Sequence, residues 1–321
     1  MNVDRMLEMC HRDQWRMADL EWNREPRKFS RDDEIAIVQL FTDMAGIERL
    51  AGALFAQQEK RATDPRLREI FRSFVRDEAR HAAVAERLAE HYDVHKYKTY
   101  TINPDLARFT PHFVNAIRFL SDDIANVYIT VGELVLDVAL LRSINDYVND
   151  DMSQAAMHLI NRDESRHIAV DYHMTEYYAS PAYLETLASR PRPSLTQRLR
   201  AWWTFANVIY HLRPFGKAVF FDPMDRVDPT GLRIKEAFKR MQLLGLKPGV
   251  ADRPFVKFMT TIHSLFNHPI AGPLFGRVLI RIAGLDPRIM VQLYTDAECE
   301  RAQKMSFEEL AQDALGAKFA H

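Results

Sequence analysis

A five-residue motif that occurs twice is the part of this chain best suited to do chemistry. The sequence Asp-Glu-Ala-Arg-His at 77–81 returns as Asp-Glu-Ser-Arg-His at 163–167. A separate glutamate precedes each copy at nearly the same interval, Glu48 before the first and Glu133 before the second. Four carboxylates and two imidazoles are the ligand set that holds two iron ions inside a helix bundle. The candidate metal ligands are therefore Glu48, Glu78, His81, Glu133, Glu164 and His167.

The types of these six residues suit a buried pair of metal ions. Four carboxylates carry four negative charges, which cancel the charge of two divalent cations and so lower the cost of burying them. Imidazole is a suitable iron ligand, and a histidine three residues after a glutamate lies on the same face of a helix. Each Glu-x-x-His unit thus provides one bridging carboxylate and one nitrogen, and the separate glutamate completes the set.

Long helices must position these ligands. Capping residues and apolar periodicity predict them at about 31–60, 64–92, 122–149 and 151–179. The turns fall roughly midway between the paired glutamates, so the two members of each pair lie at similar heights. Two further helices are predicted at about 3–22 and 103–120, and the second of these has the place of a long crossover connection.

A surface position for the motifs is the main alternative, because Asp-Glu-x-Arg-His is polar enough for a solvated helix face. The residues beside Glu48 and Glu133 are small and apolar, however, with Met-Ala-Gly-Ile at 44–47 and Val-Gly at 131–132. A glutamate in such surroundings is a buried charge that needs a cation. A third Glu-x-x-His, at 8–11, has no upstream partner glutamate and is interpreted as a surface coincidence.

The chain after residue 190 is rich in proline and is predicted to form shorter helices. These are expected at about 195–221, 230–243, 252–266, 271–284 and 305–316. We interpret residues 191–321 as a helical extension, without chemistry of its own, packed on a metal-binding domain of residues 1–190. Its aromatic runs Trp202-Trp203 and Phe220-Phe221 are predicted to be core residues, with an apolar tunnel as the alternative hypothesis.

The composition is that of an ordinary globular protein and argues against several classes. The 321 residues are 47% hydrophobic and 27% charged, and the net charge of -1 gives no bulk attraction to nucleic acid or anionic membranes. Cys10 and Cys299 lie far apart, which leaves no disulfide framework. No uncharged apolar stretch reaches about 18 residues, and the charged N-terminus lacks an apolar signal core. We therefore expect a cytoplasmic protein with no membrane span and no nucleic-acid partner.

At the six candidate ligands the chain resembles the ferritin-like di-iron carboxylate superfamily. That group includes ferritins, ribonucleotide reductase small subunits, acyl-carrier-protein desaturases and arylamine N-oxygenases, and the resemblance covers roughly residues 31–179. With the helical pattern of the whole chain, it predicts an all-α fold: a ferritin-like four-helix bundle with a long crossover helix and an appended C-terminal helical layer. It implies two iron ions, with Mn/Fe or Mn as alternatives that the same ligands suit, a ferredoxin-type electron donor and a homodimer.

The motif residues that are not ligands receive supporting roles from this resemblance. Asp77 and Asp163 are expected to hold the ligand histidine of the other motif by its second ring nitrogen. Arg80 and Arg166 are expected to pair with acidic residues of neighbouring helices.

Departures from the relatives narrow the predicted function. Ferritins end soon after the fourth long helix, whereas this chain continues, which argues against iron storage. The position of the radical tyrosine in ribonucleotide reductase is Ala85 here, so a stored radical at that position is excluded. Ile160 replaces the third histidine of the arylamine N-oxygenases, so that resemblance lacks its most diagnostic residue, although size and spacings remain compatible.

Five further residues are candidates near the metal ions. Asp137, one turn after the third-helix glutamate, would donate a proton during oxygen activation or supply an extra ligand, with a surface aspartate as the alternative. Asp171, one turn after the second histidine, either supports the ligands or is an exposed helix residue. The candidate pocket residues are Gly52, Tyr128 and Ile160. Gly52 either leaves space for oxygen or substrate or allows close helix packing, and Tyr128 is interpreted as a packed core tyrosine.

The predicted function is that of a non-haem di-iron oxygenase. Such an enzyme activates dioxygen to hydroxylate, N-oxygenate or desaturate a small or acyl organic substrate. The alternative has no diffusible organic product: a ferroxidase, a peroxide-handling protein or a ligand-binding di-metal oxidase. The shape of the pocket, and not the bundle, selects the substrate.

Overall fold

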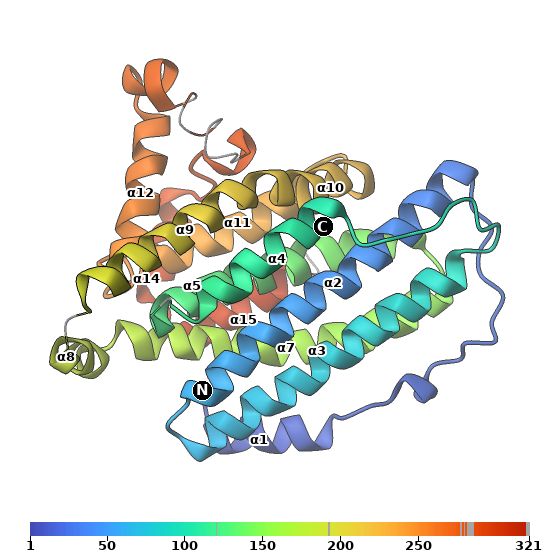
Figure 1. Cartoon of the computed structure of the whole chain (residues 1–321), viewed down its shortest axis with the longest axis horizontal. Coiled ribbons are helices and arrows are strands. Elements are labelled where there is room, and N and C mark those ends of the chain that lie inside the picture. Colours follow the sequence, from blue (N-terminus) through green and yellow to red (C-terminus); the bar gives the residue numbers. More distant parts are fainter. Residues whose placement is uncertain (120, 192, 277, 279, 281–285, 319–321) are drawn as a thin grey trace.

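Helices form the regular secondary structure of the protein, as the sequence predicts. The computed structural model describes residues 1–119, 121–191, 193–276, 278, 280 and 286–318, and no strand occurs within these ranges. Figure 1 shows long helices packed side by side, with the shorter helices of the C-terminal part along one side of them. The all-α fold class is confirmed.

Four long helical segments carry the six candidate ligands, with bounds close to those predicted. They are α2 (Arg31–Arg61), α3 (Pro65–Tyr92), a segment made of α5 (Asp122–Glu133), η2 (Leu134–Leu141) and α6 (Arg142–Val148), and α7 (Asp151–Ala179). The side chains of Ser30, Asp64 and Asp150 accept hydrogen bonds from backbone N–H groups in the first turns of α2, α3 and α7. These caps set where each helix begins and hence the height of its ligands.

The third segment differs from a plain α-helix in its middle part, η2, which is π-helical. The chain is slightly longer between Glu133 and the end of α6 at Val148 than between Glu48 and the end of α2 at Arg61. The additional length falls in η2, immediately after Glu133. A π turn holds more residues than an α turn, so the two glutamates can keep comparable heights despite their unequal spacing.

The N-terminal segment does not form the helix predicted over 3–22. α1 (Val3–Arg12) ends at Arg12, and only a short 3-10 turn, η1 (Met17–Asp19), follows it. Between them, the indole Nε1 of Trp15 donates a hydrogen bond of 2.7 Å to Asp163 Oδ2. A tertiary contact to a buried carboxylate has thus overridden the local helical pattern.

α4 (Pro104–Ile117) joins the ligand-bearing helices to the C-terminal part. It packs against α2 on one side and against α9 (Leu195–Phe215) on another. The ring of Phe109 stacks on that of Phe215 with centroids 4.2 Å apart. α4 is slightly shorter than the predicted 103–120 helix and follows α3 as a connection should.

The C-terminal part contains more helices than predicted. The predicted helices correspond to α9 with η3 (Gly216–Phe221), α11 (Leu232–Gly245), α12 (Pro254–Asn267) and α15 (Phe307–Ala317). The additional elements are α8 (Pro181–Ser189), α10 (Asp222–Val227), η5 (Pro287–Ile289) and α14 (Asp296–Lys304). Several of these begin with a proline in the first turn, where proline starts a helix and does not break it. The predicted 271–284 helix includes η4 (Gly272–Gly276) and otherwise lies partly outside the described residues.

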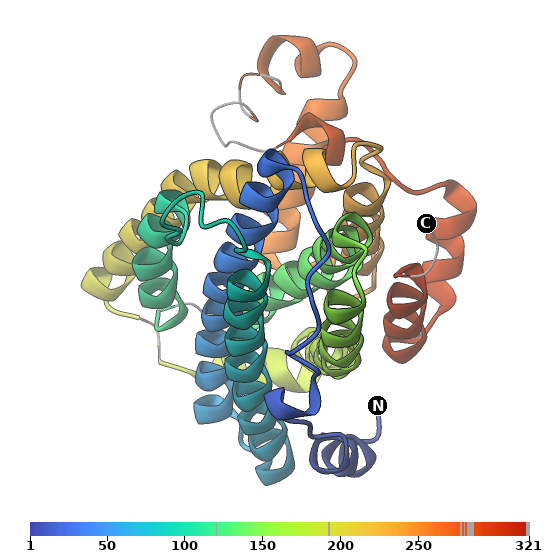
Figure 2. The ribbon, with the colours of Figure 1, turned by 90° about the vertical axis from the view of Figure 1, so that its right-hand side faces the viewer.

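The C-terminal helices pack on the ligand-bearing ones. α11 contacts η2, and α15 contacts α7. Figure 2 shows α15 beside α7, on the far side from α2 and α3. Whether residues 1–190 and 191–321 form separate units stays a prediction.

The segment Asp122–Val148 is, among the described residues, the one helix long and apolar enough to cross a membrane by length and composition. In its most apolar stretch, 72% is buried inside the protein, and a core helix passes the same test. The predicted absence of a membrane span is neither confirmed nor contradicted by this segment and stays a prediction.

Candidate metal centre

Six buried side chains from the four long segments meet in the interior, and they are the six candidate ligands of the sequence. Each is at most 2% exposed. Their ligand atoms form two groups within 4.8 Å: Glu48, Glu78, His81 and Glu164 in one, and Glu78, Glu133, Glu164 and His167 in the other. Glu78 and Glu164 belong to both groups, so these two carboxylates could bridge a pair of ions.

Both histidines present the same nitrogen to the cluster. His81 Nδ1 lies 3.0 Å from Glu164 Oε1, and His167 Nδ1 lies 3.0 Å from Glu164 Oε2. The other ring nitrogens face aspartates: His81 Nε2 is 3.1 Å from Asp163 Oδ2, and His167 Nε2 is 3.6 Å from Asp77 Oδ2. Carboxylates therefore face both nitrogens of each ring, which favours protonated imidazoles in the metal-free protein. A cation bound at Nδ1 would displace that proton, and the aspartate would keep the other proton on Nε2.

The two aspartates are themselves held by arginines. Arg166 Nη2 donates to Asp163 Oδ1 at 2.7 Å and to Asp77 Oδ2 at 3.2 Å, and Arg80 contacts both aspartates as well. The expected pairing of both arginines is confirmed. Burial alone would raise the pKa of Asp163, but hydrogen bonds and charge from His81, with the charge of Arg166, lower that pKa below its ordinary value. Asp163 therefore stays ionised and able to accept.

Two residues of the N-terminal segment also contact the aspartates and arginines behind the histidines, and the sequence did not predict either of them. Trp15 donates to Asp163 and stacks on the ring of His81, with centroids 6.4 Å apart. The Gln14 side chain accepts from Arg80 at 3.1 Å. Such contacts join positions far apart in sequence and leave no local signal beyond a tryptophan in an otherwise charged segment.

The glutamates of the cluster lack hydrogen-bond partners for most of their oxygens. Both oxygens of Glu48 and of Glu78, and one each of Glu133 and Glu164, are buried without a partner. Burial and the charge of Glu164 raise the pKa of Glu48 to about 7 and those of Glu78 and Glu133 well above 4.5. Burial would do the same to Glu164, but His167 and His81 outweigh it and lower its pKa. Buried carboxylates in this state need protons or cations.

The charges around the cluster balance except for those of the four glutamates. The two aspartates that hold the histidines have two arginine partners, as described above. Asp137 has Lys318, and burial raises the pKa of Asp171 well above its ordinary value, which favours its neutral form. Two divalent cations would therefore neutralise the site. Carboxylate and imidazole suit both iron and manganese, so these residues fit such a pair without selecting between the two metals.

We expect the metal-free protein to become less stable as pH rises, and bound metal to oppose this loss. The pKa of Glu48 is raised from 4.5 to about 7. Burial lowers the pKa of His81, but Asp163 and Glu164 raise it more, so that it goes from 6.5 to about 9. Between these unfolded and folded values the folded state binds more protons, so its free energy of unfolding falls as pH rises. Metal ions replace those protons.

The measurement is thermal unfolding of chelator-treated and Mn²⁺-loaded protein at about pH 6 and about pH 8. The gain in Tm on loading should be larger at the higher pH. An equal or smaller gain there would show that these groups do not exchange protons for metal.

Asp137 is buried, so its alternative interpretation as a surface aspartate is wrong. It lies on η2 with 0% exposure, and the ammonium of Lys318, just after α15, contacts its Oδ2. Lys318 also donates to Ser165 Oγ at 3.1 Å, next to Glu164. Burial raises the pKa of Asp137 to about 6 although Lys318 opposes this shift. The C-terminal extension thus adds a charged group beside the cluster, which sequence reasoning did not anticipate.

Asp171 is likewise buried, with 0% exposure, so the exposed-residue alternative is wrong. Neither of its carboxyl oxygens has a hydrogen-bond partner. Support of the ligands by Asp171 stays a prediction.

The three candidate pocket residues are packed against other side chains. A Cβ atom on Gly52 would lie 3.2 Å from Glu78 Cβ, so this glycine serves close packing of α2 on α3 and leaves no space for substrate. The ring of Tyr128 packs between those of Phe113 and Phe255, at 5.8 and 5.7 Å, as a core tyrosine would. Ile160 is fully buried on α7.

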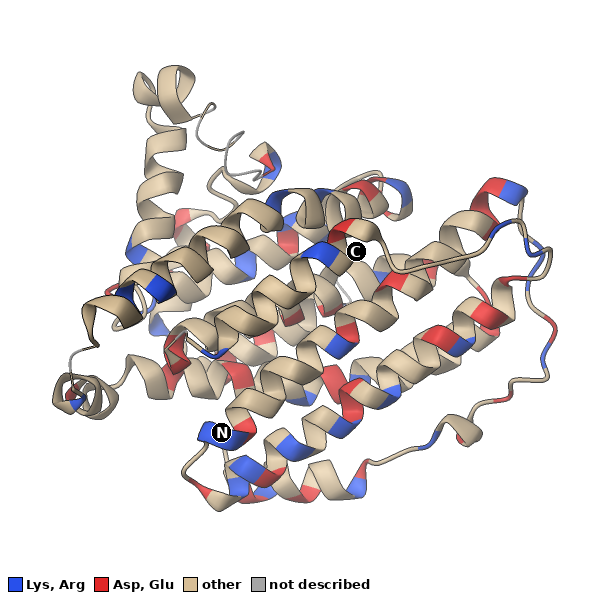
Figure 3. Cartoon of the chain, viewed as in Figure 1, with Lys and Arg blue, Asp and Glu red and all other residues tan. Residues whose placement is uncertain are grey.

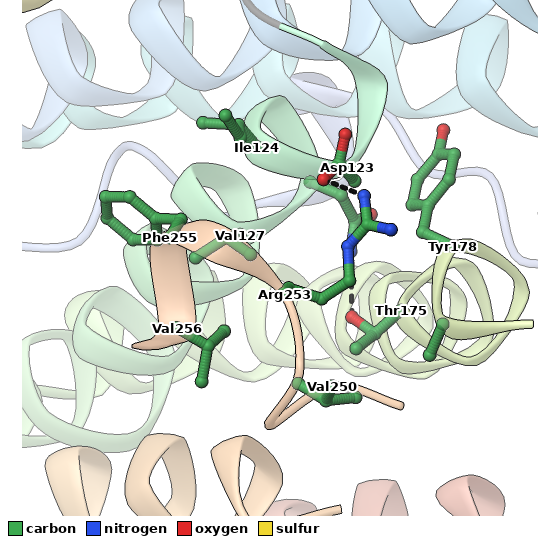
Figure 4. A pocket seen from close by; sticks show the side chains of 11 residues that line it. Asp123, Ile124, Val127, Thr175, Tyr178, Val250, Arg253, Phe255 and Val256 are labelled. Atoms are coloured by element: carbon green, nitrogen blue, oxygen red, sulfur yellow. Dashed lines mark hydrogen bonds and ion pairs between the residues drawn. The ribbon is translucent and has the colours of Figure 1, made fainter. Parts of the chain in front are cut away.

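Two cavities adjoin the ligand-bearing helices, and none of the six ligands lines either of them. The first, of about 20 Å³, lies between α5, α7 and the start of α12 and has room for one water molecule. Figure 4 shows Arg253 beside it, paired with Asp123 of α5. The second, of about 350 Å³, lies between α1, α7 and α15. Neither of these two spaces reaches the six candidate ligands.

Exposure decides the remaining sequence hypotheses. Glu8 and His11 are exposed, which confirms the third Glu-x-x-His as a surface coincidence. Trp202 and Trp203 are 74% and 73% exposed, so their predicted place in the core, or along a tunnel, is wrong. Phe220 and Phe221 are half-buried.

Comparison of the chain with protein-family models, curated proteins and solved structures gave no match.

Proposed function

We propose that this protein is a di-iron oxygenase of the ferritin-like type, which activates dioxygen to oxidise an organic substrate. One observation carries the proposal: two groups of four buried ligand atoms share Glu78 and Glu164. Paired carboxylates with one imidazole per ion are the ligands by which such bundles hold two irons. The unpartnered glutamate oxygens and the uncompensated negative charge support the same conclusion.

In this proposed fold, a four-helix bundle is formed by α2, α3, the α5–η2–α6 segment and α7, with α4 as its crossover. Extensive packing of α2 on α3, and contacts of α7 with α3, α5 and α6, support this assignment. The caps described above give the helices starting points that bring the paired glutamates together.

Each part of the centre has a distinct role in this proposal. Glu48 and His81 would complete the ligands of one ion, Glu133 and His167 those of the other, and the two shared glutamates would bridge them. A bound ferrous pair supplies the electrons that reduce dioxygen. The chain itself excludes water by burial and orients both imidazoles through the aspartates behind them. Asp137, with a pKa near 6, can exchange a proton close to neutral pH.

An oxygenase of this type needs an electron donor and a metal pair. Turnover would draw electrons from a ferredoxin-type donor, and the protein would act as a homodimer. Iron is proposed for both positions, with manganese or a mixed pair as the alternative that the same ligands accept.

A second function, oxidation of iron or removal of peroxide, is favoured by one observation. Neither described cavity is lined by a ligand of the cluster, and small inorganic substrates need no large pocket. The length of the chain beyond α7 favours the oxygenase instead.

Anaerobic loading with ferrous iron followed by rapid mixing with oxygen separates the two functions. We expect about two irons per chain and a transient long-wavelength absorption whose decay an organic substrate accelerates. Direct conversion to a stable ferric product would favour iron oxidation. Failure to bind iron or manganese would contradict both functions.

An Asp137→Asn variant tests the proton-exchange role. It should keep both metal ions, because Asp137 belongs to neither group of ligands, and should slow formation or decay of the transient by at least about tenfold. Lys318→Met, which removes the paired cation, is the companion variant. Unchanged kinetics with normal metal content in Asp137→Asn would remove that role.

A further inference from the structure

One side of α9 exposes a strip of large apolar side chains. Leu195, Leu199, Trp202, Trp203 and Tyr210 are 62–76% exposed, and we call them the α9 face. At about 3.6 residues per turn, these positions fall within an arc of about 100° on one side of the helix. Figures 1 and 2 show α9 on the outside of the molecule, away from α3 and α7.

Packing within the chain does not account for the α9 face. The buried residues of α9 are Thr204, Val208 and Phe215, which lie on the opposite side of the helix, and α9 packs on α4. No residue from 195 to 203 is buried. Two adjacent tryptophans that are each three-quarters exposed form the kind of apolar patch that marks an interaction site.

Charge identifies the kind of partner. Residues 186–221 contain no Asp or Glu but six basic residues: Arg190, Arg192, Arg198, Arg200, Arg213 and Lys217. Helical positions place Arg198 and Arg200 on opposite flanks of the α9 face. Although the whole chain has a net charge of -1, this segment is basic and apolar (Figure 3). Its partner should be both anionic and apolar.

A membrane surface meets both conditions better than a second copy of the chain. A two-fold dimer through this face would bring identical arginines together, with no acidic residue of α9 to pair with them. At a bilayer surface, tryptophan and tyrosine lie at the headgroup level, while arginines reach anionic headgroups from the flanks. Another part of the chain is also apolar and exposed: α12 has no buried residue, and Phe258 of α12 and Phe275 of η4 are 49% and 65% exposed.

We propose that the α9 face binds the surface of membranes that contain anionic lipids, with its tryptophans at the headgroup boundary and its arginines on the headgroups. This binding is peripheral and does not depend on the metal centre or on its proposed chemistry.

The test uses the full chain with vesicles of phosphatidylcholine alone and with about one-third phosphatidylglycerol. The protein should co-sediment with the anionic vesicles only, with a blue shift of its tryptophan emission. Replacing both residues, Trp202→Ser and Trp203→Ser, should weaken binding by about 100-fold. Arg198→Glu should weaken it by about tenfold. Helical content and metal binding should not change.

Lys28→Glu is the matched control, because it makes the same charge change at an exposed site in the connection before α2. It should bind the anionic vesicles like the unchanged protein. The proposal is overturned if the unchanged protein does not bind them, or if the double tryptophan variant binds equally well. If the unchanged protein is a dimer that does not bind vesicles, and the double tryptophan variant is a monomer, the α9 face is an interface between two copies of the chain.

Discussion

A His167→Ala variant is expected to bind ferrous or manganous ions at least about 100-fold more weakly than the unchanged protein, with its helices intact. The variant loses the nitrogen ligand of one group of four, and Asp77 loses the imidazole behind which it lies. His81→Ala should act in the same way on the other group. Metal per chain after anaerobic loading measures the loss, and circular dichroism checks the fold.

His11→Ala is the matched control for both variants. His11 also follows a glutamate by three residues but is exposed on α1, so its removal should leave metal content unchanged. Full metal content in both His81→Ala and His167→Ala would refute the proposed centre, whatever the protein's activity.

An Arg166→Met variant should lose about 3 kcal/mol of stability, toward the lower end of the cost of breaking a buried ion pair. Arg166 is 2% exposed and donates to both Asp77 and Asp163. Methionine fills similar space but cannot donate, so two buried aspartates would keep only Arg80 as a cationic partner. Urea unfolding of the metal-free protein measures the change, and metal affinity should also fall by about tenfold or more, since the aspartates orient the histidines.

Arg76→Met provides the comparison. Arg76 is exposed and lies 3.5 Å from Glu69 on the same helix, α3, so its loss should cost less than about 1 kcal/mol. Equal stability of the two variants would mean that Arg166 does not hold the aspartates in the folded protein.

Local signals explain why the sequence predicted α2, α3 and α7 closely. Helix starts follow from capping residues such as Ser30 and Asp64, whose side chains accept backbone N–H groups within the same turn. The spacing of three residues from Glu78 to His81 puts both on one helix face whatever surrounds the helix. Two equal arms on either side of a short turn bring Glu48 and Glu78 to the same level.

Features that depend on distant contacts were not predictable in this way. The early end of α1 reflects the bond from Trp15 to Asp163, and the contact of Lys318 with Asp137 joins α15 to η2. Gly52 in isolation suggested a space, but the structure fills it with the stem of Glu78.

The sequence by itself determined the helical class, the long helices and the six residues that meet at their centre, because caps, periodicity and short turns act within a few residues of the chain. The tertiary structure decided which charges surround that centre and which apolar side chains remain exposed. Trp202 and Trp203 have the composition of core residues, yet only the packing of α9 on α4 leaves them on the outside. Burial and pairing are properties of the folded arrangement, since the partner of each buried or exposed group lies far away in sequence.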